Sequence, residues 1–408
     1  MVPRHLSVPT AHSHDVGRVV PLIVLPMSHS VTGVGLGEYR MSQLMMPPAV
    51  ADKFLVYTTK THEDVAAAST LSSPVSGIVI CDRAPRVAVQ RVRLAGYRSV
   101  VIPEVGAWTR AVATADSPTV LQDPDALSQI SLDSWASNLL RAGADAVFTP
   151  SKFVGMGDWD ALRAVLRAGE ETKLPEVVTL VATDAAMLDS RYLQTFVDVV
   201  VTDRPVAFVF AAGRAPFRPR GRVAGLRCLM SRLPGCFLLA TEPLVATDGY
   251  AHGASGAAIG IGGGARQPKR PQDTSRPNAK GFLPGLFLRD LWEHRTPDVY
   301  ADWFANSPSP TCRACNGRAL DVFDHTDADK RIILSHNVHT WLAVFDELRA
   351  RARTEQRRWS AGEWASALAA HLTLRPAAGT LEADIVLRQL VELDDPLGRR
   401  TTSQGALR

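Results

Sequence analysis

Short, continuous apolar runs recur along the first two thirds of the chain and alternate with stretches of helical periodicity. The clearest are GIVIC at residues 77–81 and VAFVFA at residues 206–211. They lack the alternation of apolar and polar positions that marks a strand with one face in water, and they are typical of strands buried on both faces, as in a parallel sheet. Runs of this kind predict strands at residues 21–27, 54–58, 77–81, 99–102, 146–149, 177–182, 206–211, 237–241 and 257–260.

Helical segments separate most of these strands. The pattern predicts helices at residues 87–96, 131–142, 159–168, 185–196 and 223–232. Repeated strand–helix units of about thirty residues indicate an α/β fold, and about eight strands favour a closed (β/α)8 barrel of the TIM type over an open sheet. We assign the barrel to residues 51–300, after an N-terminal lead at residues 1–50. In such a barrel the active side chains follow the C-terminal ends of the strands.

The pattern changes after the last predicted strand. Residues 260–280 read GIGGGARQPKRPQDTSRPNAK, which is Gly-rich, then basic and Pro-rich, with no apolar periodicity. We expect this stretch to be a loop on the functional face of the barrel. The predicted order after it is helices at 286–294 and 299–305, a zinc-binding segment and helix at 301–353, and C-terminal helices with a tail at 354–408.

Composition narrows the class of protein. The chain has 408 residues, of which 46% are hydrophobic, enough for a large core. It has no run of 18 apolar residues, so we expect no membrane span. Its five cysteines are an odd and sparse set, which favours a reducing cytoplasm over a disulfide framework. The formal net charge of +4 is compatible with a polyanionic partner.

Two cysteines and two histidines late in the chain form the best candidate for a metal site. Cys312 and Cys315 are spaced C-x-x-C in a turn rich in Pro and Ser, and His336 and His339 follow about twenty residues on, where we expect a helix to open. A C-x-x-C turn can place two thiolates on one metal ion, and a His on the first turn of a following helix can reach the same point. Zinc prefers this set of sulfur and nitrogen ligands. The alternative is a free thiol pair beside a helix with two surface histidines.

This segment also resembles the zinc segment of the queuine-type tRNA-guanine transglycosylases. That family carries C-x-C-x-x-C, then a helix start like R-A-x-L, then I-H-N-L leading into a helix that ends R-E-I-R. The matching stretches of this chain are CRAC at 312–315, RAL at 318–320, LSHNV at 334–338 and FDELR at 345–349. The order of the motifs is therefore similar to that of the family.

The resemblance has one clear departure in the metal ligands. The family's first Cys falls at Pro310, so one of its four zinc ligands is missing. His339 lies one helical turn beyond His336 and is the natural substitute, with His325 as the alternative.

The resemblance implies more than a metal site. It implies a (β/α)8 barrel with zinc as cofactor, and exchange of guanine or a 7-deazaguanine in RNA or DNA. In that family an inactive chain can pair with an active one, so a dimer with a like or an unlike chain is also implied.

The family's catalytic carboxylates have no direct counterparts here. Its nucleophilic Asp falls at Ile259 or Gly260, neither of which carries a carboxylate. We therefore expect a neighbouring strand end to supply one, either Glu242 directly after a strand or Asp248 in the loop behind it. Glu104, in the stretch PEVGAW, stands near the family's general base. For Asp248 the alternative is the capping of a short helix.

Basic residues flank the Gly-rich turn and suggest a nucleic-acid contact. Arg266, Lys269 and Arg270 follow GIGGG, and a Gly-rich turn at a strand end exposes backbone N–H groups that can hold phosphates. The alternative is a solvated loop.

Three functions remain open from the sequence. The first is base exchange on RNA or DNA with a rebuilt active site. The second is a catalytically silent paralogue that binds nucleic acid or a partner subunit. The third is an unrelated barrel enzyme that acts on a small phosphorylated ligand.

Overall fold

The computed structural model describes most of the chain but not every predicted feature. The described residues are 46–71, 73–121, 130–273, 283–308, 310, 318–319, 323–377 and 381–395. The strand expected at residues 21–27 and the cysteines Cys312 and Cys315 lie outside these ranges. None of the helices in the described ranges is long and apolar enough to cross a membrane.

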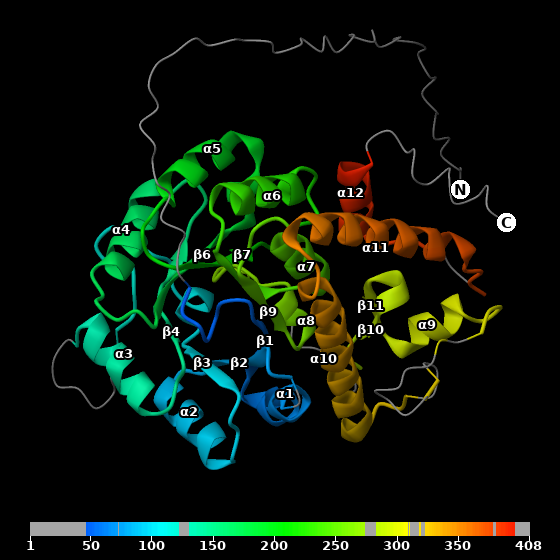
Figure 1. The fold of residues 1–408 in the computed structure, drawn as a ribbon, viewed down its shortest axis with the longest axis horizontal. Coiled ribbons are helices and arrows are strands. Elements are labelled where there is room, and N and C mark those ends of the chain that lie inside the picture. The colour runs from blue at the N-terminus through cyan, green and yellow to red at the C-terminus, as the bar shows by residue number, and fades with distance from the viewer. Residues whose placement is uncertain are drawn as a thin grey trace, which may run out of the picture. The chain divides into compact units, whose positions relative to one another are not determined.

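The described residues form a nearly closed barrel of eight parallel strands, as the apolar runs predict (Figure 1). Neighbouring strands in the barrel are consecutive in sequence, and the last strand pairs with the first. A short additional strand, β5 (Phe153–Val154), also pairs with β6 beyond β4. The barrel strands are β1 (Phe54–Thr59), β2 (Ser76–Cys81), β3 (Val100–Glu104), β4 (Val147–Phe148), β6 (Val177–Asp184), β7 (Val206–Ala211), β8 (Phe237–Thr241) and β9 (Gly256–Gly260).

The barrel is incomplete between β3 and β4, where a side chain takes over part of the ladder. The backbone N–H of Asp145 donates to the carbonyl of Val101 at 3.0 Å. The Asp145 carboxylate in turn accepts from the N–H of Val101 at 2.7 Å. The two strands are thus joined by a single residue and not by a regular ladder.

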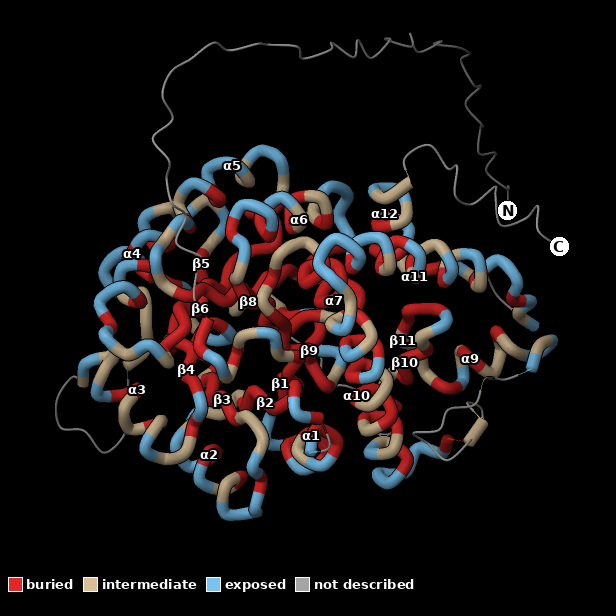
Figure 2. The backbone as a smooth tube through the Cα atoms, in the orientation of Figure 1, coloured by how far each residue is buried: buried red, intermediate tan, exposed pale blue. Residues whose placement is uncertain are grey.

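Alternate residues of each strand face the barrel interior and the surrounding helices, and both sets are buried (Figure 2). The interior cluster includes Leu55, Val79, Ile102, Leu180, Val209 and Ala258. On β1, Phe54 and Val56 face outward into the cluster shared with the helices. Each fully buried Val, Leu or Ile contributes roughly 1.5–3 kcal/mol, and this explains why the strands read as unbroken apolar runs.

Helices that follow the strands surround the barrel. Seven of them are α1 (Glu63–Thr70), α2 (Pro85–Leu94), α3 (Leu132–Arg141), α4 (Trp159–Glu170), α5 (Ser190–Val199), α6 (Arg222–Arg232) and α7 (Pro243–Ala251). The eighth position is filled by α10 (Asp327–Arg349), which packs against α1, α7 and β1. The rings of Phe345 on α10 and Phe54 on β1 stack with centroids 3.6 Å apart.

An insertion therefore separates β9 from the helix that completes its unit. It contains the short helix α8 (Gly263–Arg266), strands β10 (Leu286–Leu288) and β11 (Glu293–Arg295), and helix α9 (Pro297–Trp303). The helix expected at 286–294 is wrong, because β10 and β11 form an antiparallel hairpin there. The Asn337 side chain on α10 accepts from the N–H of Phe287 at 2.7 Å and donates to the carbonyl of Gly285 at 2.8 Å. This tertiary partner fixes the extended backbone.

Helix α10 also begins earlier than expected. Its N-cap is Thr326, whose hydroxyl accepts from the N–H of Asp329 at 3.1 Å. The two histidines His336 and His339 therefore lie in the middle of the helix and not at its start. The imidazole Nε2 of His336 hydrogen-bonds to the carbonyl of Phe287 at 2.9 Å and so ties α10 to the hairpin.

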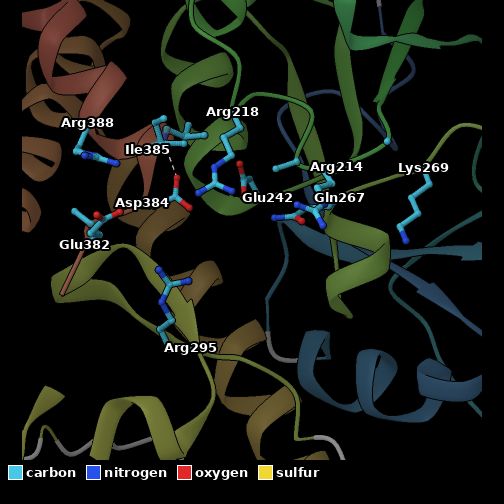
Figure 3. Close-up of a pocket in the computed structure, with 14 residues that line it drawn as sticks. Arg214, Arg218, Glu242, Gln267, Lys269, Arg295, Glu382, Asp384, Ile385 and Arg388 are labelled. Atoms are coloured by element: carbon cyan, nitrogen blue, oxygen red, sulfur yellow. Dashed lines mark hydrogen bonds between the residues drawn. The ribbon is translucent and has the colours of Figure 1, made fainter. Parts of the chain in front are cut away.

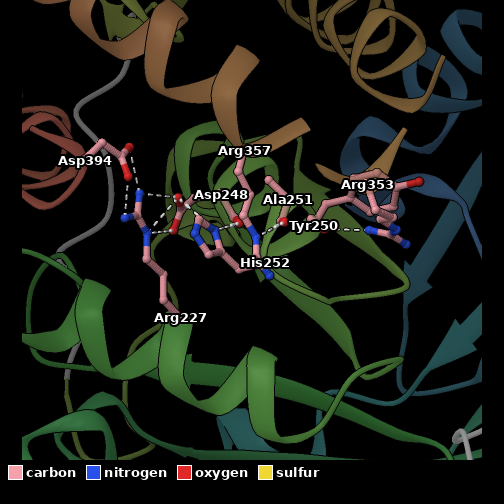
Figure 4. A network of polar contacts seen from close by, with 8 residues as sticks. All are labelled: Arg227, Asp248, Tyr250, Ala251, His252, Arg353, Arg357 and Asp394. Atoms are coloured by element: carbon pink, nitrogen blue, oxygen red, sulfur yellow. Dashed lines mark hydrogen bonds and ion pairs between the residues drawn. The ribbon is translucent and has the colours of Figure 1, made fainter. Parts of the chain in front are cut away.

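Two C-terminal helices, α11 (Arg353–Thr373) and α12 (Ile385–Asp394), pack on the outer side of α6 and α7. Figure 4 shows the polar network that fastens them. Arg227 on α6 pairs with Asp248 on α7 at 2.7 Å and with Asp394 on α12 at 2.7 Å. Arg353 on α11 donates to the carbonyl of Tyr250 at 2.6 Å and lies over the ring of that residue. The C-terminal helices are thus part of the barrel assembly.

Candidate active site

Two cavities meet at the C-terminal mouth of the barrel, with volumes of about 820 and 670 Å³. They lie between the loops that follow β7, β8 and β9, the β10–β11 hairpin and the start of α12 (Figure 3). We call the two together the mouth cleft. The residues that line both cavities are Glu242, Gln267, Lys269, Arg295 and Asp384.

A bulge in β8 directs Glu242 into the mouth cleft. Ala240 has φ +53°, and the pairing of β8 with β9 shifts between Leu238 and Thr241. Such bulges re-aim the residues that follow them. Glu242 then occupies the N-cap position of α7, with Pro243 as the first residue of the helix.

The chemical state of Glu242 follows from its surroundings. Burial, together with the nearby charge of Asp384, raises the pKa of its carboxyl to about 8, and Arg266 partly opposes the change. Glu242 is therefore protonated at neutral pH. A carboxyl in this state can donate a proton to a bound group, as carboxylic acids with raised pKa do in glycoside-cleaving enzymes.

The three basic residues expected to bind nucleic acid have different surroundings. Arg266 is buried, donates to the carbonyl of Ile261 at 3.0 Å, and has a pKa lowered to about 10 by burial. Arg270 pairs with Asp184 at 3.2 Å and with Asp273 at 3.0 Å. Lys269 is the one of the three that lines both cavities of the mouth cleft, and it forms no ion pair in the described ranges.

Three other arginines are better placed to meet an anion. Arg214 and Arg218 lie on the loop between β7 and α6, and Arg388 lies on α12. Their side chains are exposed and form no ion pair with any residue that the structure describes (Figure 3). The sequence carries a signal for the first two, because Arg214 closely follows the strand predicted at 206–211 and both lie in the basic stretch RAPFRPRGR at residues 214–222.

Glu104 does not line the mouth cleft. It is 1% exposed at the end of β3, where one carboxylate oxygen accepts from the Tyr57 hydroxyl at 2.9 Å and the other from the N–H of Gly106 at 2.7 Å. Burial raises its pKa, and these hydrogen bonds together with Cys81 oppose the change. Both oxygens are thus occupied, and the arrangement fits a role in joining β1 to the β3 loop.

Asp248 is also remote from the mouth cleft. It lies inside α7 and is 1% exposed, with Arg227 bound to its carboxylate. The alternative role for Asp248, as the cap of a short helix, is also wrong, because α7 begins at Pro243 and Asp248 is an interior residue of it. Of the three expected catalytic carboxylates, only Glu242 lines the cavities.

The positions of Ile259 and Gly260 explain why no carboxylate occurs there. Ile259 points away from the barrel interior into the layer of helices. A Cβ at Gly260 would lie 2.2 Å from the carbonyl carbon of Ala265, so α8 approaches too closely for any side chain. A catalytic carboxylate at this mouth must come from another element.

The hairpin strand β11 supplies three polar residues that the sequence analysis did not single out. Glu293 is 3% exposed, contacts Arg295, and lies 3.3 Å from the Nε2 of His371 on α11. Burial raises the pKa of Glu293 to about 8. His294 packs on Phe287 with ring centroids 4.9 Å apart, and burial lowers its pKa well below the ordinary range. The run EHR at residues 293–295 was the only signal, and it lies across the end of the helix expected at 286–294.

The structure describes the two histidines of the expected zinc site and not its two cysteines. Among the described residues, no three His, Cys, Asp or Glu side chains are grouped so as to hold a metal ion. Cys312 and Cys315 lie outside that part of the chain, while His336 and His339 are three residues apart on α10. The Nδ1 atom of His336 is buried with no hydrogen-bond partner among the described residues, and its Nε2 is held by the carbonyl of Phe287. This fits a metal ligand, because ligating histidines are commonly oriented by a hydrogen bond at the other nitrogen.

The sequence matches no protein-family model, and comparison with characterised proteins finds no significant relative. The likeness to transglycosylases therefore depends on the residues quoted above.

Proposed function

We propose that this chain is a transglycosylase-like protein that exchanges guanine or a 7-deazaguanine in a nucleic acid, with the mouth cleft as its active site. The observation that carries the proposal is Glu242, a carboxyl with a raised pKa in an arginine-lined cleft at the C-terminal mouth of a barrel. This is the end at which barrels of the TIM type carry their chemistry.

Glu242 has the properties of the acid in such an exchange. When the bond between the sugar C1′ and the base nitrogen breaks, its electron pair leaves with the base, and a proton from Glu242 neutralises it. The carboxylate that results can take a proton from the incoming base, whose nitrogen then forms the new bond to C1′. The same group thus serves as acid and as base, and it regains its proton at the end.

The partner that fits the mouth cleft is RNA or DNA. A base must leave its stack to enter a cavity at the barrel mouth, while its phosphates stay outside. Arg214, Arg218 and Arg388 line the larger cavity with their side chains exposed, and Lys269 lies in both cavities. These four cations support a path for the phosphodiester backbone along the loop between β7 and α6.

We expect the triple variant Arg214→Ala, Arg218→Ala and Arg388→Ala to bind nucleic acid more weakly and with less dependence on salt. Each lost phosphate contact lowers the slope of log K against log salt by about 0.7–0.9, so the slope should fall by roughly 2–3. Fluorescence anisotropy with labelled RNA and DNA over a series of salt concentrations measures it. Arg163→Ala is the control, since Arg163 is exposed on α4 and pairs with Asp160 away from the cleft. Equal slopes for the triple variant and the control would remove the path from the proposal.

Zinc belongs to the proposal as a structural metal. Cys312, Cys315 and His336 would hold it, with His339 as the fourth ligand, and zinc would crosslink the segment before α10 to the helix itself. The free Nδ1 of His336 supports this set.

We expect purified protein to contain about one zinc ion per chain, because this donor set has a strong preference for that metal. Elemental analysis under non-chelating conditions measures the content, and Cys315→Ser should lower it. Hydrogen exchange after chelation should increase in the segment that leads into α10 more than in the barrel strands. Absence of zinc from well-folded protein would end this part of the proposal.

A second function is supported by one observation. Neither Ile259 nor Gly260 has room or chemistry for the family's nucleophile, and this favours a chain that binds nucleic acid or a partner subunit without catalysis. Exchange of labelled guanine into RNA and into DNA, with and without a candidate partner chain, separates the two. Incorporation by this chain alone supports exchange, whereas tight binding without incorporation supports the silent role.

A further inference from the structure

Asp384 brings a second carboxylate to the mouth cleft from outside the barrel. It is the N-cap of α12, and its Oδ1 accepts from the N–H of Val386 at 2.7 Å. Its other oxygen makes no hydrogen bond or ion pair with any part of the chain that the structure describes. Asp384 and Glu242 both line both cavities, so they lie where the two cavities join.

The position of α12 relative to the barrel is fixed by polar contacts at its far end and middle. Arg227 on α6 holds Asp394 near the C-terminus of α12, with two hydrogen bonds of 2.7 and 3.0 Å. The Gln389 side chain donates to the carbonyl of Arg218 at 2.8 Å. The start of the helix is thereby held over the barrel mouth.

We propose that Asp384 is the second functional carboxylate of the mouth cleft, acting opposite Glu242, so that the C-terminal helices complete the site that the barrel begins. The role that this proposal gives to the negative charge of Asp384 rests on the function proposed above. Positive charge develops on the sugar ring as a base departs, and a fixed carboxylate facing it lowers the barrier. Glu242 then supplies the proton and Asp384 the negative charge.

The division of roles follows from the charged groups that surround Glu242. Asp384 faces it from α12, and Arg266 faces it from α8. Arg218 and Arg295 line the larger cavity together with Glu242 and Asp384 (Figure 3). Lys269 lines both cavities. The carboxyl of Glu242 has no hydrogen bond to any described residue, while Asp384 accepts a hydrogen bond from a backbone N–H, a contact that favours negative charge on a carboxylate.

The test compares Asp384→Asn with the matched control Glu392→Gln. Asparagine also caps helices, so α12 should remain in place. Glu392 lies on the same helix, is exposed, and pairs with Arg220, so its loss removes the same charge away from the cleft. The first measurement is the titration of the Glu242 side chain by carboxyl 13C NMR, which needs no substrate. The second is exchange of labelled guanine.

We expect the titration midpoint of Glu242 to fall by on the order of one pH unit in Asp384→Asn and to stay unchanged in Glu392→Gln. Exchange should fall at least tenfold in the first variant and stay at the parent level in the second. Identical Glu242 titrations in the two variants would overturn the pairing, whether or not the parent exchanges bases. A shifted titration in a chain that never exchanges bases supports the pairing and removes the proposed function alone. If the parent exchanges bases and Asp384→Asn is as active as the parent, the role of Asp384 is overturned and the proposed function stands.

Discussion

Replacing Glu242 by glutamine is expected to lower base exchange by about 100- to 10,000-fold, the usual contribution of a positioned acid–base group. Glutamine keeps the shape of the side chain but has no proton to give at any pH. Binding of RNA or DNA should change little, because the phosphates meet Arg214, Arg218 and Arg388 and not Glu242. Single-turnover exchange and anisotropy titration on the same preparation separate the two effects.

The dependence of exchange activity on pH tests whether the protonated form of Glu242 is the active one. The pKa of Glu242 is raised to about 8, so the acid form dominates at neutral pH and is lost as the pH rises through that value. Activity of the parent should therefore fall about tenfold per pH unit above pH 8, whereas the residual activity of Glu242→Gln should lack that decline. Glu171→Gln, an exposed site at the end of α4, is the control. A fully active Glu242→Gln would refute the assignment of the acid.

The second large effect concerns stability. Arg227→Met should destabilise the folded state by about 3–5 kcal/mol, since it leaves a buried carboxylate without its partner. Asp248 is only 1% exposed, and Arg227 supplies three of its hydrogen bonds. Urea unfolding followed by circular dichroism measures the loss.

Two further variants distinguish a buried charge from a lost contact. Adding Asp248→Asn to Arg227→Met should recover part of the stability, because the amide costs less to bury than the carboxylate. Arg220→Met removes the surface pair with Glu392 and should change stability by no more than about 1 kcal/mol. If Arg227→Met unfolds at the same urea concentration as Arg220→Met, the network in Figure 4 does not stabilise the fold as described.

The barrel was predictable because its strands are buried on both faces. Residues 206–211 and 237–241 were placed as strands to the residue, since parallel strands under helices leave an unbroken apolar run. The hairpin at β10 and β11 was not predictable in the same way. Its short stretches have no periodicity of their own, and Asn337, far along the chain, fixes their backbone.

The residues of the mouth cleft likewise divide into those that the sequence could predict and those that it could not. Glu242 was found because it directly follows a strand, which is a local rule. Arg295 and Asp384 were missed because they reach the cleft from an inserted hairpin and a C-terminal helix, and no local pattern reports such convergence. Glu104 at a strand end and Asp248 in an expected loop were local inferences too, but they are engaged by Tyr57 and Arg227, partners that only the folded chain brings near.

The stacking of Phe54 on Phe345 has a consequence for synthesis of the chain. The first described strand obtains the cover of its outer face from a helix about 290 residues later. At translation rates of about 5–20 residues per second, roughly 15–60 s separate the two residues. Throughout that time Phe54 lacks its stacking partner Phe345, and the edge of β1 that pairs with β9 stays unpaired until about 200 further residues have been made. The nascent barrel is thus an open sheet with an apolar face for most of its synthesis, a state that chaperones recognise and that aggregates when they are scarce.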